Sequence, residues 1–220
     1  MSIQLLLSIE LPQLSYQDSG ERALRLMSEY QVSHLPLVHK DDYIALISEE
    51  DIMDWDTPEQ PLSYAEFLTF RPAIQAQSHP YEALKTVSDF NLSVLPVVDS
   101  QNHFMGTITK EGLFAYLIDN NATHEQGAIL VLEIEQKNYS LSEIARICES
   151  NNVTILSSFI KTIKETGMLQ VTIKTNQNET QALAATFERY EYHVAEIYAS
   201  DDQDKNIKSN YDMLMHYISI

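Results

Sequence analysis

Several features are scarce in this 220-residue sequence, and each scarcity excludes a kind of protein. The single cysteine, Cys148, has no partner for an internal disulfide or for a C-x-x-C metal site. Basic residues are few, because 14 lysines and arginines stand against 32 aspartates and glutamates, giving a formal net charge of −18. Nucleic acids and anionic membranes attract basic surfaces. We therefore expect neither as a partner.

Long apolar segments are also missing. No stretch approaches the roughly 18 apolar residues of a membrane-spanning helix, and the opening MSIQLLL lacks the basic start of a signal peptide. The remaining composition is that of a folded chain, with 44% hydrophobic residues and only 5 glycines and 7 prolines. These features predict a cytoplasmic protein with one large or two small domains. Cys148 follows Ile144 and Ile147 in an apolar pattern and is predicted to be a buried core residue.

Catalytic sequence motifs are absent as well. The chain has no H-E-x-x-H, G-x-S-x-G, P-loop or G-x-G-x-x-G pattern, and its 7 histidines are scattered along the sequence. The sequence therefore predicts a protein that is not an enzyme, with no catalytic residue, no metal and no resident cofactor.

What the sequence does contain is an internal repeat. A displacement of 60 residues superimposes matching residue types in the same order. The matched pairs are Leu14 with Ile74, Asp18 with Ser78, Ala23-Leu24 with Ala83-Leu84, Tyr30 with Phe90, and Leu35-Pro36-Leu37-Val38 with Leu95-Pro96-Val97-Val98. After one inserted residue, Ile47-Ser48 matches Ile108-Thr109. Two copies of one unit are therefore predicted, over residues 1–62 and 63–126.

Each copy has the pattern strand–helix–strand–strand–helix, βαββα. Asp18 and Ser78 are predicted to cap the first helix of their copies, Asp18 in a capping box with Glu21. The short strands are expected at residues 35–38, 43–47, 95–98 and 104–108. Pro36 and Pro96 would be unusual in a central strand, so we expect them at sheet edges or strand starts. One copy is too small to bury its sheet, so the two are expected to share a core.

The repeat ends near residue 126, and a third unit is predicted over residues 127–199. Its strands and helices follow the order βαββαβ, which is the ferredoxin-like pattern, and Ser140 with Glu143 forms the capping box of its first helix. Residues 200–220 are predicted to form an amphipathic helix whose apolar side needs a partner. That apolar side consists of Ile207, Tyr211, Leu214, Met215 and Ile218. The fold class is therefore α+β.

The clearest sign of a binding site follows the second strand of each copy. The first copy reads Ser48-Glu-Glu-Asp51 at a predicted helix start, and the second reads Thr109-Lys-Glu-Gly112. A hydroxyl and the free N–H groups at a helix start suit a phosphate, and a carboxylate one turn later accepts hydrogen bonds from two ribose hydroxyls. The same Ser-x-x-Asp pattern is also a helix cap that needs no ligand. Both interpretations are open at this point.

Residues 10–118 resemble the cystathionine-β-synthase (CBS) domain family. The resemblance rests on the paired repeat, the h-P-h-V strands and the G-h-h-[ST]-x-x-D element, where h is an apolar residue. The family occurs as tandem pairs that commonly bind adenine nucleotides or related adenosyl ligands. The resemblance implies that Ser48 and Asp51 contact phosphate and ribose, and that His34 stands at the position of a basic phosphate contact.

Both copies depart from the family pattern. The first has Ala45 where the family usually has glycine, whereas the second keeps the glycine and Thr109 but has Gly112 in place of the aspartate. The second copy also has Val94 at the position of His34. The resemblance therefore implies one intact ribose-binding site, in the first copy.

The third unit resembles an ACT domain, a regulatory fold that often pairs with itself, and the whole arrangement is similar to bacterial acetoin-utilisation regulatory proteins. The resemblance implies a non-catalytic regulatory protein that senses AMP, ADP, ATP, NAD or S-adenosylmethionine through its CBS pair. It also implies a homodimer that acts on an unknown regulated protein. The alternative is a ligand-free scaffold for dimerisation or interaction.

Overall fold

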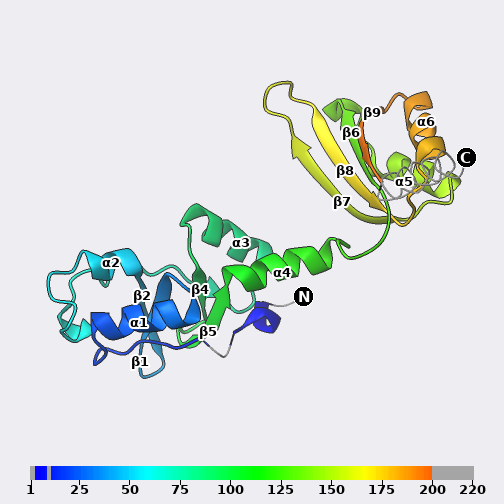
Figure 1. Cartoon of the computed structure of the whole chain (residues 1–220). Helices are drawn as coiled ribbons and strands as arrows, with labels where there is room; N and C mark the ends of the chain where they lie inside the picture. Colours follow the sequence, from blue (N-terminus) through cyan, green and yellow to red (C-terminus); the bar gives the residue numbers. More distant parts are fainter. Residues whose placement is uncertain (1–2, 9–10, 200–220) are drawn as a thin grey trace, which may run out of the picture. The chain divides into compact units, whose positions relative to one another are not determined.

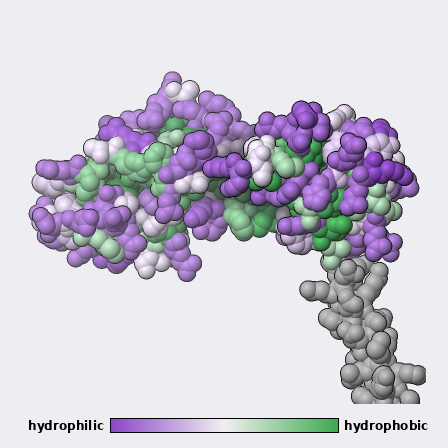
Figure 2. All heavy atoms as spheres, turned by 90° about the horizontal axis from the view of Figure 1, so that it is seen from above, coloured by the Kyte–Doolittle hydropathy of each residue, from purple (hydrophilic) through white to green (hydrophobic). Residues whose placement is uncertain are grey.

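The computed structural model describes residues 3–8 and 11–199 of the chain. The chain divides into two compact units between Leu117 and Ile118, and each unit is described by itself (Figure 1). The helix predicted within residues 200–220 lies outside the described residues. Among the residues that are described, every helix is too short or too polar to cross a membrane. Hydrophilic residues predominate on the face shown in Figure 2, with smaller hydrophobic patches among them.

The first unit follows the element order expected for two copies of one repeat. Its elements are η1 (Ile3–Leu6), α1 (Gly20–Tyr30), β1 (His34–His39), β2 (Asp42–Ser48), α2 (Glu49–Met53), η2 (Leu62–Tyr64), β3 (Ile74–Gln75), α3 (Pro80–Asp89), β4 (Val94–Val98), β5 (Phe104–Thr109) and α4 (Lys110–Asn120). Strand β1 pairs antiparallel with β2, and Leu14 adds a parallel bridge to Leu37. In the second copy β4 pairs antiparallel with β5 and parallel with β3, where Ile74 lies beside Val97. The two copies therefore have the same topology.

The two copies share one hydrophobic core, as the sequence predicts. Side chains from the central strands of both copies belong to a single buried cluster and are at most 1% exposed. They are Leu35, Leu37 and Ile47 from the first copy and Leu95, Val97 and Ile108 from the second. Each such side chain contributes about 1.5–3 kcal/mol when removed from water. The copies also touch at equivalent positions, because the Ser33 N–H donates to Ser93 Oγ over 3.0 Å.

The first helix of each copy begins one residue later than predicted. Ser19, not Asp18, caps α1, and its hydroxyl accepts the N–H of Arg22 over 3.3 Å. Asp18 instead accepts hydrogen bonds from the N–H and hydroxyl of Ser15, at 2.7 and 2.8 Å, so it closes the preceding turn. The predicted capping box with Glu21 is therefore wrong.

The first helix of the second copy, α3, is likewise capped one residue further along. His79, not Ser78, is its cap, and His79 Nδ1 accepts the N–H of Tyr81 over 3.1 Å. Pro80 occupies the first helical turn, as predicted. Adjacent polar residues compete for a cap, and sequence alone does not say which one wins.

The prediction that the two prolines lie at sheet edges or strand starts is confirmed for Pro36, which lies in an edge strand of a two-stranded sheet, and wrong for Pro96. Pro96 lies inside β4, the central strand of the three-stranded sheet, and Pro36 lies inside β1. The Pro36 carbonyl accepts the N–H of Leu14 over 2.8 Å, on the side away from β2. Because the nitrogen and carbonyl of one strand residue face the same side, the missing N–H does not interrupt the ladder with β2.

The second unit has the order βαββαβ. Its elements are β6 (Ile129–Ile134), η3 (Gln136–Asn138), α5 (Leu141–Ser150), β7 (Ile155–Thr162), β8 (Leu169–Thr175), α6 (Gln181–Arg189) and β9 (His193–Tyr198). The four strands form an antiparallel sheet in the order β7-β8-β6-β9. Helices α5 and α6 lie on the same side of this sheet (Figure 1). They bury Ile144, Ile147 and Phe187 against Leu130 and Leu132 of β6.

Two expectations for this unit concern α5. Ser140 caps the helix, since its Oγ accepts the Glu143 N–H over 3.3 Å, but the Glu143 carboxylate pairs with Arg146 at 2.7 Å. Only half of the predicted capping box is therefore formed. Cys148 is buried, and burial raises the pKa of its thiol to about 11. The thiol stays protonated near neutral pH, which suits the predicted core role.

The hairpin turns of the two copies in the first unit meet at His103. Its Nδ1 lies 3.0 Å from Asp99 Oδ2 in the same hairpin, and its Nε2 lies 3.9 Å from Asp42 Oδ1 in the other copy. The backbones also join there, because the Phe104 N–H donates to the Asp41 carbonyl over 2.7 Å. The hydrogen bond and charge of Asp99, helped by the charges of Asp42 and Asp41, raise the pKa of His103 above its usual 6.5. Protonated His103 therefore connects the hairpins.

We expect the stability of the first unit to depend on the protonation of His103. Because its pKa is raised in the folded state, the contribution is fully present below the unfolded value of 6.5 and is lost as the pH rises through the raised value. His103→Gln should flatten the change in urea midpoint between about pH 6 and 8, whereas His39→Gln should keep it. The same pH dependence in His103→Gln and in the unaltered chain would contradict this role.

Candidate functional site

Ser48 and Asp51 hold each other at the start of α2. Ser48 Oγ accepts the Asp51 N–H over 3.0 Å. In return, Asp51 Oδ2 accepts the Ser48 N–H over 3.0 Å and the Ser48 hydroxyl over 2.7 Å. This is a complete capping box, and it stabilises a helix of only five residues. The Ser-x-x-Asp pattern therefore does form a helix cap, which is one of the two interpretations of the sequence.

The capping box leaves half of the Asp51 carboxylate available. Both hydrogen bonds to this carboxylate reach Oδ2, and within the described part of the chain none reaches Oδ1. The bonds to Oδ2 fix the orientation of the carboxylate, so Oδ1 is held in place without being used. A fixed oxygen of this kind can accept hydrogen bonds from ligand hydroxyls. Capping and ligand binding are thus compatible at Asp51.

His34 lies at the junction of the two copies, opposite Ser48 in the β1–β2 register. Its Nδ1 lies 3.1 Å from the hydroxyls of Ser33 and Ser93, and it accepts the Ser93 N–H over 3.3 Å. A ring nitrogen that accepts an N–H carries no proton, so these contacts fit the neutral Nε2–H tautomer. Burial lowers the pKa of His34, and the charge of Asp51 opposes this shift. His34 is therefore an uncharged, hydrogen-bonded residue at neutral pH.

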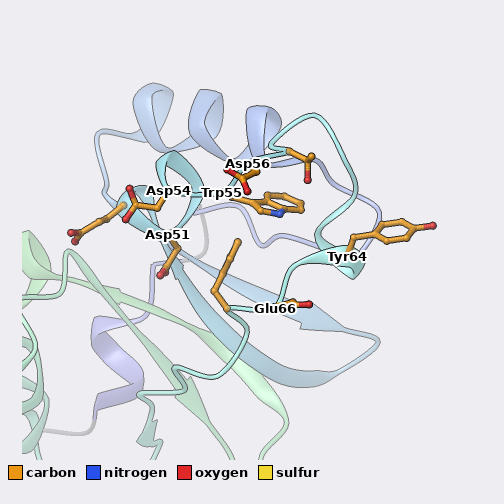
Figure 3. Close-up of a pocket in the computed structure, with 9 residues that line it drawn as sticks. Asp51, Asp54, Trp55, Asp56, Tyr64 and Glu66 are labelled. Atoms are coloured by element: carbon orange, nitrogen blue, oxygen red, sulfur yellow. The ribbon is translucent and has the colours of Figure 1, made fainter.

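Two surface grooves flank α2, and each contains part of the predicted site. The larger, the Asp51 groove, has a volume of about 790 Å³ and is lined by Glu50, Asp51, Asp54, Trp55, Asp56, Thr57, Tyr64, Glu66 and Phe67 (Figure 3). The smaller, the His34 groove, has a volume of about 510 Å³ and is lined by Ser33, His34, Ser48, Glu49, Glu50, Met53, Asp54, Phe90 and Asn91. The predicted phosphate contacts, His34 and Ser48, are thus in a different groove from the predicted ribose contact.

The Asp51 groove combines negative charge with aromatic surface. Its five carboxylates are those of Glu50, Asp51, Asp54, Asp56 and Glu66, and no basic side chain from the described part of the chain lines it. The rings of Trp55 and Phe67 meet edge to face, with centroids 5.6 Å apart. In the view of Figure 3 the indole of Trp55 lies between Asp51 and Tyr64. The groove therefore offers a flat apolar surface surrounded by carboxylates.

Comparison with known proteins assigns the first unit to a family. The sequence model of the CBS domain matches residues 7–57 and again residues 71–119. The first 119 residues contain a tandem pair of CBS domains. Over 102 residues, 46% of this chain, the sequence is 26% identical to the inosine-5′-monophosphate dehydrogenase of Korarchaeum cryptofilum (strain OPF8). That match spans 21% of the enzyme, so the chain covers about a fifth of the length of this relative.

Similar solved structures also contain CBS domains. A CBS domain pair/ACT domain protein from Thermotoga maritima is 18% identical, with 54% of this chain and 98% of that chain covered and a TM-score of 0.47. A protein named for acetoin utilization (AcuB) from Vibrio cholerae has the same identity, TM-score and coverage of this chain, with 91% of its own chain covered. The CBS protein CBSX2, solved in complex with AMP, is 16% identical, with 54% of this chain and 96% of that chain covered and a TM-score of 0.47.

The second CBS repeat keeps the hydroxyl of the helix cap but lacks its carboxylate. Thr109 precedes α4, and its hydroxyl accepts the Gly112 N–H over 2.9 Å, but Gly112 has no carboxylate to return the bond. Gly106 has a φ of +149°, and a Cβ there would lie 3.2 Å from Leu7. Its counterpart Ala45 is fully buried and lines neither groove of the first repeat.

We expect Gly112→Asp to complete the missing cap and to stabilise the first unit by about 0.5–1.5 kcal/mol. A Cβ at Gly112 would lie 3.1 Å from Thr109 Oγ1, so the gain requires the Thr109 side chain to shift by a few tenths of an ångström. In the first repeat, Asp51 sits against Ser48 in the same relation. Urea unfolding measures the gain, and Gly112→Asn is the uncharged control. A loss of stability in Gly112→Asp would show that the second repeat has no room for the side chain.

The aromatic wall of the Asp51 groove was not predicted from the sequence. Trp55 follows α2, and Tyr64, Glu66 and Phe67 come from the linker between the repeats. The linker runs beside β2, because the Leu46 N–H donates to the Phe70 carbonyl over 2.9 Å. The one sequence signal was the only tryptophan of the chain, four residues after Asp51.

Proposed function

We propose that the CBS pair is a non-catalytic regulatory module that senses an adenosyl ligand in the Asp51 groove. The observation that carries the proposal is the Asp51 carboxylate, which is held by Ser48 through Oδ2 while Oδ1 accepts no bond from the described residues. In this arrangement Oδ1 accepts hydrogen bonds from the ribose hydroxyls. The purine stacks on Trp55, whose ring lines the same groove.

Three further features support this proposal. The groove volume of about 790 Å³ lies within the usual range of small-molecule sites. The family match covers the repeat that carries Asp51. CBS domain pairs are typically regulatory and bind adenosyl ligands, as in the AMP complex of CBSX2. In the second repeat, Gly112 offers no carboxylate, so the proposal assigns one ribose site to the pair.

The alternative is a ligand-free scaffold, and the satisfied capping box favours it. The two proposals differ in what the purified chain carries and binds. The full chain, purified without added nucleotide and then denatured, is tested for release of an ultraviolet-absorbing adenine compound. Release, or a rise in melting temperature with an added adenosyl compound, supports the sensor. If no adenine compound is released, and none of AMP, ADP, ATP, NAD, adenosine and S-adenosylmethionine raises the melting temperature, the result supports the ligand-free scaffold.

For the whole chain, we propose a domain division that includes the second unit. We assign residues 1–62 and 63–126 to the two CBS repeats, residues 127–199 to an ACT-like unit and residues 200–220 to a terminal helix, in a cytoplasmic homodimer. The element order βαββαβ supports the ACT-like assignment. Closed two-fold pairing is the commonest form of soluble oligomer. Light scattering at micromolar concentration should give twice the mass of one chain, and a single-chain mass would contradict the dimer.

A further inference from the structure

The charge around the Asp51 groove bears on which adenosyl compounds can enter it. Five carboxylates line the groove, and no basic side chain among the described residues lines it with them. None of these carboxylates forms an ion pair within the described part of the chain. A phosphate placed here would face uncompensated like charges, which strongly oppose association.

The basic side chains His34, Arg71 and Lys110 do not line the Asp51 groove. His34 lines the other groove and is uncharged, with its Nδ1 engaged by Ser93. Arg71 lies close enough to Tyr43 to influence its titration, and Lys110 lines an apolar groove of the second repeat. Neither side chain lines the Asp51 groove. A bound phosphate would therefore lack the basic contact that usually holds one.

The helix start does not compensate for this charge. The N-terminus of a helix attracts anions through its free N–H groups. In α2, however, the first turn already carries Glu49, Glu50 and Asp51, and the helix has only five residues. The Asp51 N–H and the Ser48 N–H are both used inside the capping box. The attraction of this helix start for an anion is thus already offset by the chain's own carboxylates.

Building on the proposed function, we infer that the Asp51 groove selects an adenosyl ligand that carries no phosphate and is uncharged or positively charged. Asp51 recognises the ribose, Trp55 supports the purine, and the carboxylates of Asp56 and Glu66 favour a cationic group on the ligand. A sulfonium or amine attached to the ribose has this chemistry, and its positive charge is also attracted by aromatic faces.

The test compares three adenosyl compounds of different charge on the full chain by isothermal titration calorimetry. Adenosine and S-adenosylmethionine should each bind at least about tenfold more tightly than AMP. Added salt should weaken the binding of S-adenosylmethionine and strengthen that of AMP, because it screens attraction and repulsion alike. The double variant Asp56→Asn/Glu66→Gln should reduce the affinity gap, which is the difference in affinity between S-adenosylmethionine and AMP. The control Glu111→Gln removes a carboxylate from the equivalent region of the second repeat and should leave the gap unchanged.

The outcomes separate this inference from the proposed function. If AMP binds more tightly than adenosine, the chain is a nucleotide sensor and the charge selection is wrong. If the double variant and Glu111→Gln change the gap equally, the carboxylates of the groove do not set it, and the inference fails. If none of the compounds binds, the proposed function fails and the inference fails with it.

Discussion

Phe187→Ala is expected to lower the free energy of unfolding of the second unit by about 3–5 kcal/mol. Phe187 is fully buried between α6 and the sheet, and its ring meets that of Tyr192 edge to face with centroids 5.9 Å apart. Removing the ring leaves a cavity that the surrounding sheet and helices cannot fill by collapse. A loss of this size is a large part of the stability of a small domain.

The same variant tests whether the two units unfold separately. The chain has one tryptophan, Trp55, and it lies in the first unit. Urea unfolding followed by tryptophan fluorescence should therefore be unchanged in Phe187→Ala, while circular dichroism should show part of the signal lost at lower urea. Phe159→Ala is the matched control, since Phe159 is 46% exposed in the same unit and its loss should have little effect. An equal shift of the tryptophan transition would mean that the units unfold together.

An adenosyl ligand at about 100 times its dissociation constant should stabilise the first unit by about 2.7 kcal/mol. For a chain of this size the melting temperature should rise by roughly 5–10 °C. Asp51→Ala should abolish the rise, because it removes the proposed ribose acceptor. The same change also breaks the capping box of α2 and should cost about 0.5–1 kcal/mol without any ligand. The melting shift is therefore compared with the baseline of each variant.

A second cap supplies the control for this experiment. Glu82 accepts the His79 N–H over 3.4 Å at the start of α3, so Glu82→Ala weakens a cap outside the Asp51 groove. That variant should melt earlier than the unaltered chain and still show the full ligand shift. A ligand shift that survives in Asp51→Ala would place the ligand somewhere other than the Asp51 groove.

The repeat, the strands and the shared core were predictable because short apolar patterns in the sequence indicate the strands, and the same patterns recur in the second copy. The apolar run of β4 and its copy in β1 mark the two strands, but they do not indicate the shift in register that occurs between Leu37 and Val38 and again between Val97 and Val98. The cap of the first helix in each repeat was predicted one residue early. In the first repeat Asp18 and Ser19 both suit the role, and the turn at Ser15 decides between them.

The candidate site was predictable only at its centre. Ser48 and Asp51 are adjacent in the sequence pattern, and the structure brings them together. Whether Glu66 and Trp55 face the same groove depends on how the linker runs beside β2, and no local pattern encodes that path. The charge of the groove is likewise a property of residues that meet only after folding.

Ser33 and Ser93 occupy the same position in their repeats, and the Ser33 N–H donates to Ser93 Oγ. Such a contact between equivalent residues is typical of two like units that pair face to face. An ancestor with a single repeat would make the same contact between two identical chains, each with an equivalent groove. Fusion of the two genes releases the copies from identical sequence, so one groove can lose its carboxylate, as at Gly112, without harming the other. The asymmetry of the pair is therefore what gene duplication permits and what an assembly of identical chains forbids.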